Sequence, residues 1–232
     1  MEKITKPKII KISIYISLLT FLPGLIIGLL IAINYGPTDY SIFHNYISNL
    51  GSKQYTPAPF ILDLTLTISA IFFIPLILNL YQINSSDSSD NIDNSKRINN
   101  MNLSRRKFGY VGISFLIIGC VGMFNVGVFS MDRNQWNLHY IFSSLSFGGF
   151  TFGSFFTGIA IILKKIHIPR KIGLFMVFGP STAAIIFIIC PPPFTREFLE
   201  WIMLLSILVW YYPLVFITLQ KINKKSSFNS GN

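Results

Sequence analysis

The chain has 232 residues, of which 51% are hydrophobic and only 12% are charged, whereas charged residues make up about 25% of an average soluble domain. This composition excludes an ordinary soluble domain. The formal net charge of +10 comes from basic residues beside apolar runs, so it indicates orientation and affinity for anionic lipid rather than nucleic-acid binding. The two cysteines lie in or at the end of apolar runs and do not make a disulfide framework.

Six long apolar runs dominate the chain. Each is about 19–26 residues long, which at 1.5 Å per residue spans the ~30 Å hydrocarbon core of a bilayer. Lipid offers the backbone no hydrogen-bond partner, so these runs are expected to be helices. We predict an all-α fold, a polytopic six-helix transmembrane bundle forming one domain over residues 1–232, with spans at about 12–33, 60–81, 108–129, 138–163, 172–190 and 198–219.

The basic residues predict how the bundle is oriented. Of the 19 Lys and Arg residues, all but Lys53, Arg133 and Arg196 lie in the N-terminal tail, the second and fourth connectors or the C-terminal tail. Cytoplasmic segments carry such an excess, so both termini are expected in the cytoplasm and the 35–60 loop outside. The Ser/Asn/Asp-rich stretch 84–102 is predicted to be a disordered cytoplasmic linker. The plasma membrane is the expected location.

The first outer loop, residues 35–60, is polar and rich in turn residues. It contains prolines and tyrosines, and loops of this length are usually functional or disordered. Its aromatic content argues against disorder. The next span opens with Asp63, and a carboxylate inside a membrane span is costly and a candidate for function. The alternative is a charge at a helix N-terminus, favoured by the helix dipole.

Small residues recur at helical spacing in three spans. Gly24 and Gly28 lie four apart in the first span, and the third span carries several glycines. In the fourth span a face of small residues continues, which allows close helix approach. This face is expected to pack the third span against the fourth, or the first against the fourth. The first, third and fourth spans are therefore predicted to form the tight centre of the bundle. The face consists of Ser146, Gly149, Gly153 and Thr157.

Polar and ionisable residues gather at the outer end of the predicted bundle and leave the membrane midplane nearly bare. A transport path would need polar residues at midplane. We expect His44, Ser48, Asp63, Asp132 and His139 to converge in one outward-facing pocket. The candidate catalytic residues are His44, Asp63, Asp132 and His139, and the candidate binding residues are Asp39, Asn45, Ser48, Asn49, Asn125, Arg133 and Ser143.

Two kinds of chemistry fit these residue types. Histidine nitrogen and carboxylate oxygen ligate zinc and other divalent ions, so His44 and His139 are candidate metal ligands, although no cofactor can be named. A histidine beside an aspartate can instead act as general base on an ester or phosphodiester at headgroup depth. The alternative is that these residues cap helices, bridge loops and anchor the chain at the interface.

The segment His44-Asn-Tyr-Ile-Ser48-Asn-Leu-Gly51, followed by Pro57 and Phe60, resembles the "ISDLG…P…F" segment of the DUF998 membrane proteins. It is also similar to the "YISDxG…P…F" segment of the Frag1/DRAM/Sfk1 proteins. Asn49 stands where the motif usually has Asp, and an amide cannot carry the proton of a carboxyl group. The resemblance implies six spans.

Frag1-like proteins are tied to lipid-anchor remodelling and membrane homeostasis, so the resemblance also implies work on lipid. Two function classes stay open. One is a membrane-bound hydrolase or transferase acting on lipid headgroups, and the other is a non-catalytic scaffold or lipid-binding factor. Whether the chain is an enzyme is left undecided. In both classes the expected partners are membrane lipids and not nucleic acid, and the oligomeric state is unknown.

The predicted topology can be tested by cysteine accessibility. A cysteine replacing Ser52 should react with an impermeant thiol reagent added to intact cells, and one replacing Ser88 should react only after the membrane is permeabilised. Reaction of Ser88→Cys in intact cells would contradict the predicted orientation.

Overall fold

Six helices, each long and apolar enough to cross a membrane, make up most of the described part of the protein. The computed structural model describes residues 6–85, 96–163 and 168–229, with side chains over 6–80, 103–163 and 168–224. No strand occurs within these ranges. The prediction of an all-α, six-helix transmembrane bundle is confirmed. The helices are α1 (Pro7–Tyr35), α2 (Phe60–Ser85), α3 (Lys96–Val128), α4 (Leu138–Ile162), α5 (Arg170–Ile189) and α6 (Arg196–Asn229).

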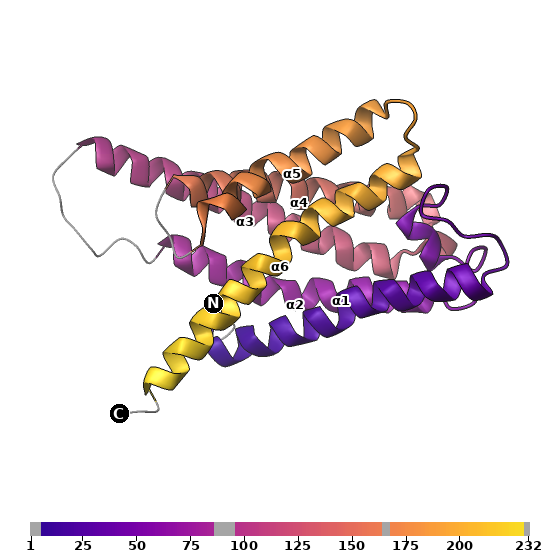
Figure 1. Ribbon diagram of the computed structural model, residues 1–232, viewed down its shortest axis with the longest axis horizontal. Coiled ribbons are helices and arrows are strands. Elements are labelled where there is room, and N and C mark those ends of the chain that lie inside the picture. The colour runs from indigo at the N-terminus through magenta and orange to yellow at the C-terminus, as the bar shows by residue number, and fades with distance from the viewer. Residues whose placement is uncertain (1–5, 86–95, 164–167, 230–232) are drawn as a thin grey trace.

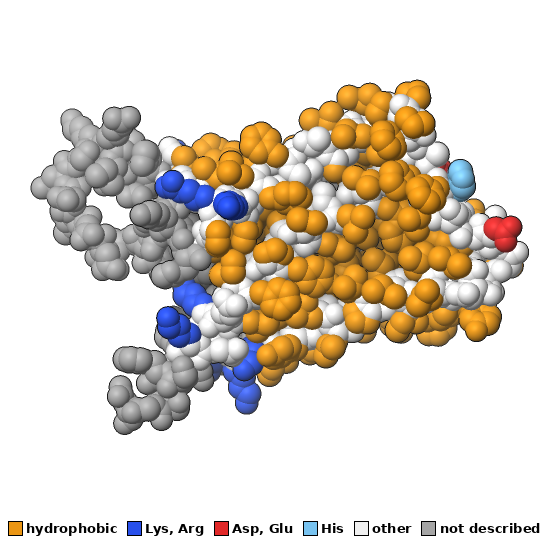
Figure 2. Space-filling view, viewed as in Figure 1, with side chains coloured by type: hydrophobic (Ala, Val, Ile, Leu, Met, Phe, Trp, Pro, Cys, Tyr) orange, Lys and Arg blue, Asp and Glu red, His pale blue; other side chains and the backbone are white. Residues whose placement is uncertain are grey.

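Each helix packs mainly against its neighbours in the chain. Helices α1 to α4 run roughly along the long axis of the bundle, and α6 crosses it obliquely (Figure 1). Both termini lie toward one end, and the α1–α2 loop covers the other (Figure 1). Lys and Arg side chains gather at the end that holds the termini (Figure 2). This separation agrees with the basic-residue pattern that predicts a cytoplasmic position for the termini.

The predicted linker at 84–102 falls largely on residues 86–95, which lie outside the described residues, as does Ser88. Its first two residues belong to α2, and residues 96–102 are the beginning of α3. Ser52 is buried, whereas Gln54 is exposed on the same loop. Gln54 is therefore the better position for an outer cysteine label.

The closest helix contact is between α3 and α4, and it depends on glycine. A Cβ added at Gly122 would lie 2.5 Å from the backbone nitrogen of Ser146. One added at Gly153 would lie 2.7 Å from the Leu116 side chain. The small-residue face of α4 therefore packs on α3 rather than on α1. The predicted place of α1 in the tight centre is wrong, because Gly24 of α1 faces Thr65 of α2.

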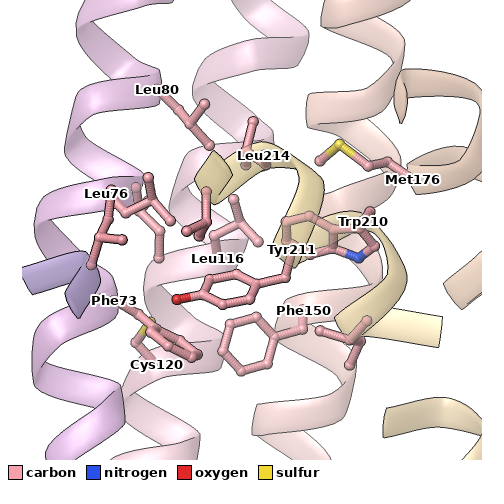
Figure 3. Packing of buried hydrophobic residues seen from close by; sticks show 14 of the residues in the cluster. Phe73, Leu76, Leu80, Leu116, Cys120, Phe150, Met176, Trp210, Tyr211 and Leu214 are labelled. Carbon is pink, nitrogen blue, oxygen red and sulfur yellow. The ribbon is translucent and has the colours of Figure 1, made fainter. Parts of the chain in front are cut away.

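The apolar core is filled by side chains that several helices direct to the middle of the bundle (Figure 3). The ring of Tyr211 on α6 lies 4.7 Å from that of Phe73 on α2, measured between centroids. Its hydroxyl is 2.9 Å from Ser17 Oγ on α1. A buried hydroxyl needs such a partner, so this bond connects α6 to the α1–α2 pair.

The α3–α4 contact predicts a contrast between two glycines of one helix. Gly153→Leu should lower the free energy of unfolding by about 1–3 kcal/mol through overpacking. Gly148→Leu is the matched control, because nothing lies within 4 Å of a Cβ placed there, and it should change stability little. Thermal unfolding of both variants in detergent measures the difference. Equal shifts in Tm would contradict the close α3–α4 packing.

Candidate functional site

The α1–α2 loop is fastened over the outer end of the bundle by hydrogen bonds to the α5–α6 connection and the start of α6. In this loop the short 3₁₀ helix η1 spans Ile47–Gly51. The backbone N–H of Ile47 donates to Glu200 Oε2 at 2.7 Å. Thr195 Oγ1 donates to the carbonyl of Phe43 at 2.6 Å, and Trp201 Nε1 donates to the carbonyl of Asn45 at 3.2 Å. The loop is therefore a lid held on one side by α6.

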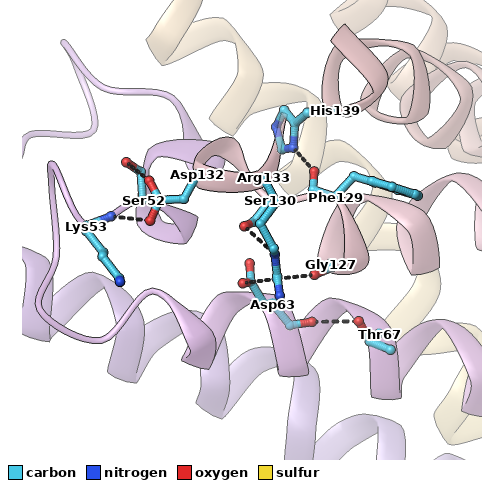
Figure 4. Close-up of polar contacts among 10 residues, drawn as sticks. All are labelled: Ser52, Lys53, Asp63, Thr67, Gly127, Phe129, Ser130, Asp132, Arg133 and His139. Carbon is cyan, nitrogen blue, oxygen red and sulfur yellow. Dashed lines mark hydrogen bonds and ion pairs between the residues drawn. The ribbon is translucent and has the colours of Figure 1, made fainter. Parts of the chain in front are cut away.

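On the opposite side, the carboxylate of Asp132 holds the same loop (Figure 4). Asp132 belongs to the 3₁₀ helix η3 (Met131–Arg133), which follows α3. One oxygen accepts a bond from Ser52 Oγ at 2.7 Å, and the other accepts one from the backbone N–H of Lys53 at 2.9 Å. Both oxygens are thus used to join the loop to the α3–α4 connection.

Asp63, at the start of α2, forms an ion pair with Arg133 (Figure 4). Arg133 Nη2 lies 2.7 Å from Asp63 Oδ2 and also donates to the carbonyl of Gly127 at 3.1 Å. The Asp63 side chain is only 15% exposed, and a carboxylate with so little water requires a partner. Arg133 is one of the outer cations that the sequence offers, and this pair joins α2 to the end of α3.

His139 is buried at the start of α4, with only 2% of its surface exposed. Its Nδ1 lies 2.8 Å from the carbonyl of Phe129 (Figure 4). A carbonyl can only accept, so Nδ1 carries a proton. Nε2 has no hydrogen-bond partner among the described residues. The ring therefore joins the end of α3 to the start of α4.

His44 lies elsewhere, exposed on the loop in a shallow recess that Phe194, Thr195 and Phe198 line. His44 and His139 thus have different surroundings, and the five residues expected in one pocket are spread over separate contacts. No group of three or more His, Cys, Asp or Glu side chains able to hold a metal occurs in the described ranges.

The remaining predicted binding residues divide into structural and cavity positions. Asn45 Oδ1 accepts a bond from the backbone N–H of Ser41 at 2.8 Å, and Asn125 Nδ2 donates to the carbonyl of Val121 at 2.8 Å. Asn49 is buried inside η1. Asp39 is exposed. These four residues lie in the structure or on the surface of the outer end, whereas Ser48 and Ser143 line a cavity.

Two tyrosines of the lid remain protonated and support its fold. Burial raises the pKa of Tyr40 well above its ordinary value, and the Glu200 carboxylate raises it further. Burial and then the Glu197 carboxylate raise the pKa of Tyr46. Tyr40 keeps its hydroxyl proton at physiological pH and donates it to the carbonyl of Tyr46 at 2.8 Å. The loop is therefore braced internally just above Glu200.

Beneath the lid, a narrow cavity extends down the middle of the bundle between α1, α2, α3, α4 and α6. The volume of the cavity is about 90 Å³. Side chains such as Phe73, Leu116 and Leu214 make most of its wall apolar (Figure 3). Its polar lining residues are Ser48, Ser143, Ser146, Glu200 and Tyr211.

Sequence reasoning missed the place of Glu200 and Ser146 in this cavity. Glu200 is 8% exposed and stands in the sequence Phe198-Leu199-Glu200-Trp201-Ile202. Glu200 is an acid among apolar residues near the start of a span, and the same pattern identified Asp63 as a candidate functional residue. The sequence indicated Ser146 only as a small residue of a packing face. Helical spacing does not show that such a residue can both contact a neighbouring helix and line a cavity.

The family of the chain follows from a comparison with known protein families. The Frag1/DRAM/Sfk1/Cwh43P N-terminal domain matches residues 10–217, which include all six membrane spans except the ends of the first and last. The chain belongs to this family. The Frag1 part of the sequence-based resemblance is confirmed, while its DUF998 part stays a prediction. No curated protein and no solved structure matches the chain significantly.

The contacts of Asp132 predict that it holds the lid closed. Asp132→Ala removes two hydrogen bonds, each worth about 0.5–1.5 kcal/mol. Amide hydrogen exchange at Ser52 and Lys53 should then become roughly 5- to 150-fold faster. Asp39→Ala is the control, because it removes the same charge from an exposed loop position. Similar exchange rates in the two variants would show that Asp132 does not hold the lid.

Proposed function

We propose that this member of the Frag1 family is a lipid-binding membrane protein that holds one acyl chain in the central cavity, with the headgroup toward the α1–α2 loop. The observation that carries the proposal is the cavity itself, whose wall is almost entirely apolar and whose lining residues include Ser48 of the lid and Glu200, which bonds the lid. An apolar chain fits such a wall, and a polar solute does not.

The extent of the cavity favours a long, thin ligand. Its lining on α2 runs from Leu62 to Leu80, a distance of about 27 Å at 1.5 Å per residue. That is close to the ~30 Å thickness of a bilayer's hydrocarbon core. An acyl chain in this cavity would exchange contacts with lipid tails for contacts with equally apolar side chains. The hydrophobic effect would therefore contribute little, and the affinity would depend on packing and on the headgroup.

Between the two function classes, the geometry favours binding over catalysis. A hydrolase or transferase needs a general base within about 3 Å of the headgroup proton it removes. None of the four predicted catalytic residues is placed for this role. His44 and His139 are not among the residues lining the cavity. Asp63 is paired with Arg133, and Asp132 holds the loop. We expect the protein to bind or present a lipid at the plasma membrane rather than to change it.

A pair of adjacent leucines on α6 tests the proposal. Leu204 lines the cavity, whereas Leu205 is 51% exposed on the outer surface of the bundle. Leu204→Trp should fill the cavity and weaken phospholipid binding at least 10-fold, about 1.4 kcal/mol. Leu205→Trp makes the same chemical change and should leave binding unaltered.

Binding is measured by native mass spectrometry of purified protein titrated with dioleoyl phosphatidylethanolamine and dioleoyl phosphatidylglycerol. Gel filtration and Tm confirm that both variants are folded. If wild-type protein retains no phospholipid, or if Leu204→Trp binds as much as Leu205→Trp, the lipid does not occupy this cavity.

A further inference from the structure

The helices of the bundle close into a ring that has a weak seam between the first helix and the last. Consecutive helices pack against one another from α1 to α6, whereas α6 contacts α1 only sparsely. Toward the end that holds the termini, Lys11 Nζ donates to Asn223 Oδ1 at 2.9 Å, and Tyr211 bonds Ser17. Beyond these bonds α1 and α6 diverge toward the end that the α1–α2 loop covers (Figure 1). The α1–α6 seam is therefore widest in its outer half, between Ser17 and the loop.

The short helix η1 of the loop lies in this outer half of the seam. It contacts α1, α2 and α6, and its side chains Ile47 and Leu50 are buried. They belong to an apolar cluster that includes Leu25 of α1 and Trp201 of α6. Ile47 and Ser48 also line the central cavity. Displacement of η1 would therefore open the cavity at the place where α1 and α6 are apart.

Hydrogen bonds from α6 and the connection before it hold η1 in the seam. The N–H of its first residue donates to Glu200, and the backbone just before it accepts bonds from Trp201 and Thr195. A few such bonds open more readily than the packing between two long helices. Asp132 holds the loop on the other side, just after η1. The loop can therefore move away from α6 and stay attached at Asp132.

We propose that the outer half of the α1–α6 seam is the entrance through which a diacyl phospholipid reaches the cavity from the outer leaflet, and that η1 is the movable plug of this entrance. The inference rests on the proposed lipid-binding function and adds the route by which the lipid enters and leaves.

The structure of a diacyl phospholipid fits an entrance in the side of the bundle. Its two chains are joined at glycerol, and a narrow cavity that holds one chain leaves the other in the bilayer. The wall must then be open where the two chains separate, which is near the headgroup and hence near the loop. A chain that enters from the side also stays among apolar groups, whereas a route through water would expose its whole apolar surface.

Two disulfide bridges, one on each side of the loop, test the entrance. Phe43→Cys with Phe198→Cys joins the loop to α6, where the centroids of the two rings are 5.2 Å apart. Ser52→Cys with Asp132→Cys joins the loop to the α3–α4 connection, where Ser52 Oγ lies 2.7 Å from Asp132 Oδ1. Both pairs are made in a Cys190→Ser background, since the other native cysteine is buried.

Protein loaded with dioleoyl phosphatidylethanolamine before oxidation is mixed with an excess of the deuterated lipid, and native mass spectrometry follows the exchange. The bridge to α6 should slow exchange roughly 10-fold or more, because η1 can no longer leave the seam, and dithiothreitol should restore the rate. The bridge to the α3–α4 connection should leave the rate unchanged, because the loop stays attached there during opening. The amount of bound lipid should be the same in all forms.

A pair of tryptophan substitutions tests the plug without any bridge. Trp201→Phe removes the bond to the carbonyl of Asn45, so η1 should leave the seam more often and lipid exchange should become roughly 2- to 12-fold faster. Trp136→Phe makes the same chemical change at a side chain that is 87% exposed, and it should leave the rate unaltered.

The outcomes separate the entrance from the function on which it rests. Equal exchange with the α6 bridge oxidised and reduced, or equal rates in the two tryptophan variants, overturns the entrance and leaves lipid binding in place. Slow exchange with the other bridge as well means that the whole loop must lift, which also overturns an entrance confined to the α1–α6 seam. If wild-type protein binds no phospholipid, the lipid-binding function fails and the entrance fails with it.

Discussion

The hydrogen bond from the backbone N–H of Ile47 to the side chain of Glu200 holds the α1–α2 loop over the outer end of the bundle. The arrangement of that end depends on this contact. At 2.7 Å, it attaches the α1–α2 loop to α6 directly above the cavity. Asp132 attaches the other side of the loop to the α3–α4 connection. Because lipid offers no hydrogen-bond partners, a polar loop can cover apolar helices only when the protein itself satisfies its backbone. The polar residues of the outer end meet this requirement.

Uneven packing among the helices explains why the bundle has both a rigid centre and an open interior. Glycines bring α3 and α4 so close that added Cβ atoms at Gly122 and Gly153 would collide with the facing helix. By contrast, α6 contacts α5 closely and α1 and α4 only sparsely, and aromatic side chains such as Tyr211 fill part of the intervening space. Large side chains keep helix axes apart, and the gaps they leave become the cavity. The cavity and the tightest helix contact thus lie at different helix pairs.

The polar residues at the outer end have different structural roles. The sequence predicted only that they lie at a common depth in the membrane, which does not distinguish these roles. Asp63 and Asp132 share a level and a charge, yet one neutralises Arg133 and the other accepts two hydrogen bonds from the lid. His139 bridges α3 and α4 through the carbonyl of Phe129. Such contacts over-determine the position of the lid.

The sequence by itself determined the number of membrane helices, their approximate extent and the end of the bundle where polar residues gather. Those features follow from local rules, because a span must be about 20 apolar residues long and must satisfy its own backbone. Only the tertiary structure decided that α4 packs on α3 rather than on α1, that His44 and His139 have separate surroundings, and that Glu200 lines the cavity. These outcomes depend on which faces of different helices meet. Helical spacing assigns residues to a face, but the choice of facing partner comes from side chains far apart in the chain.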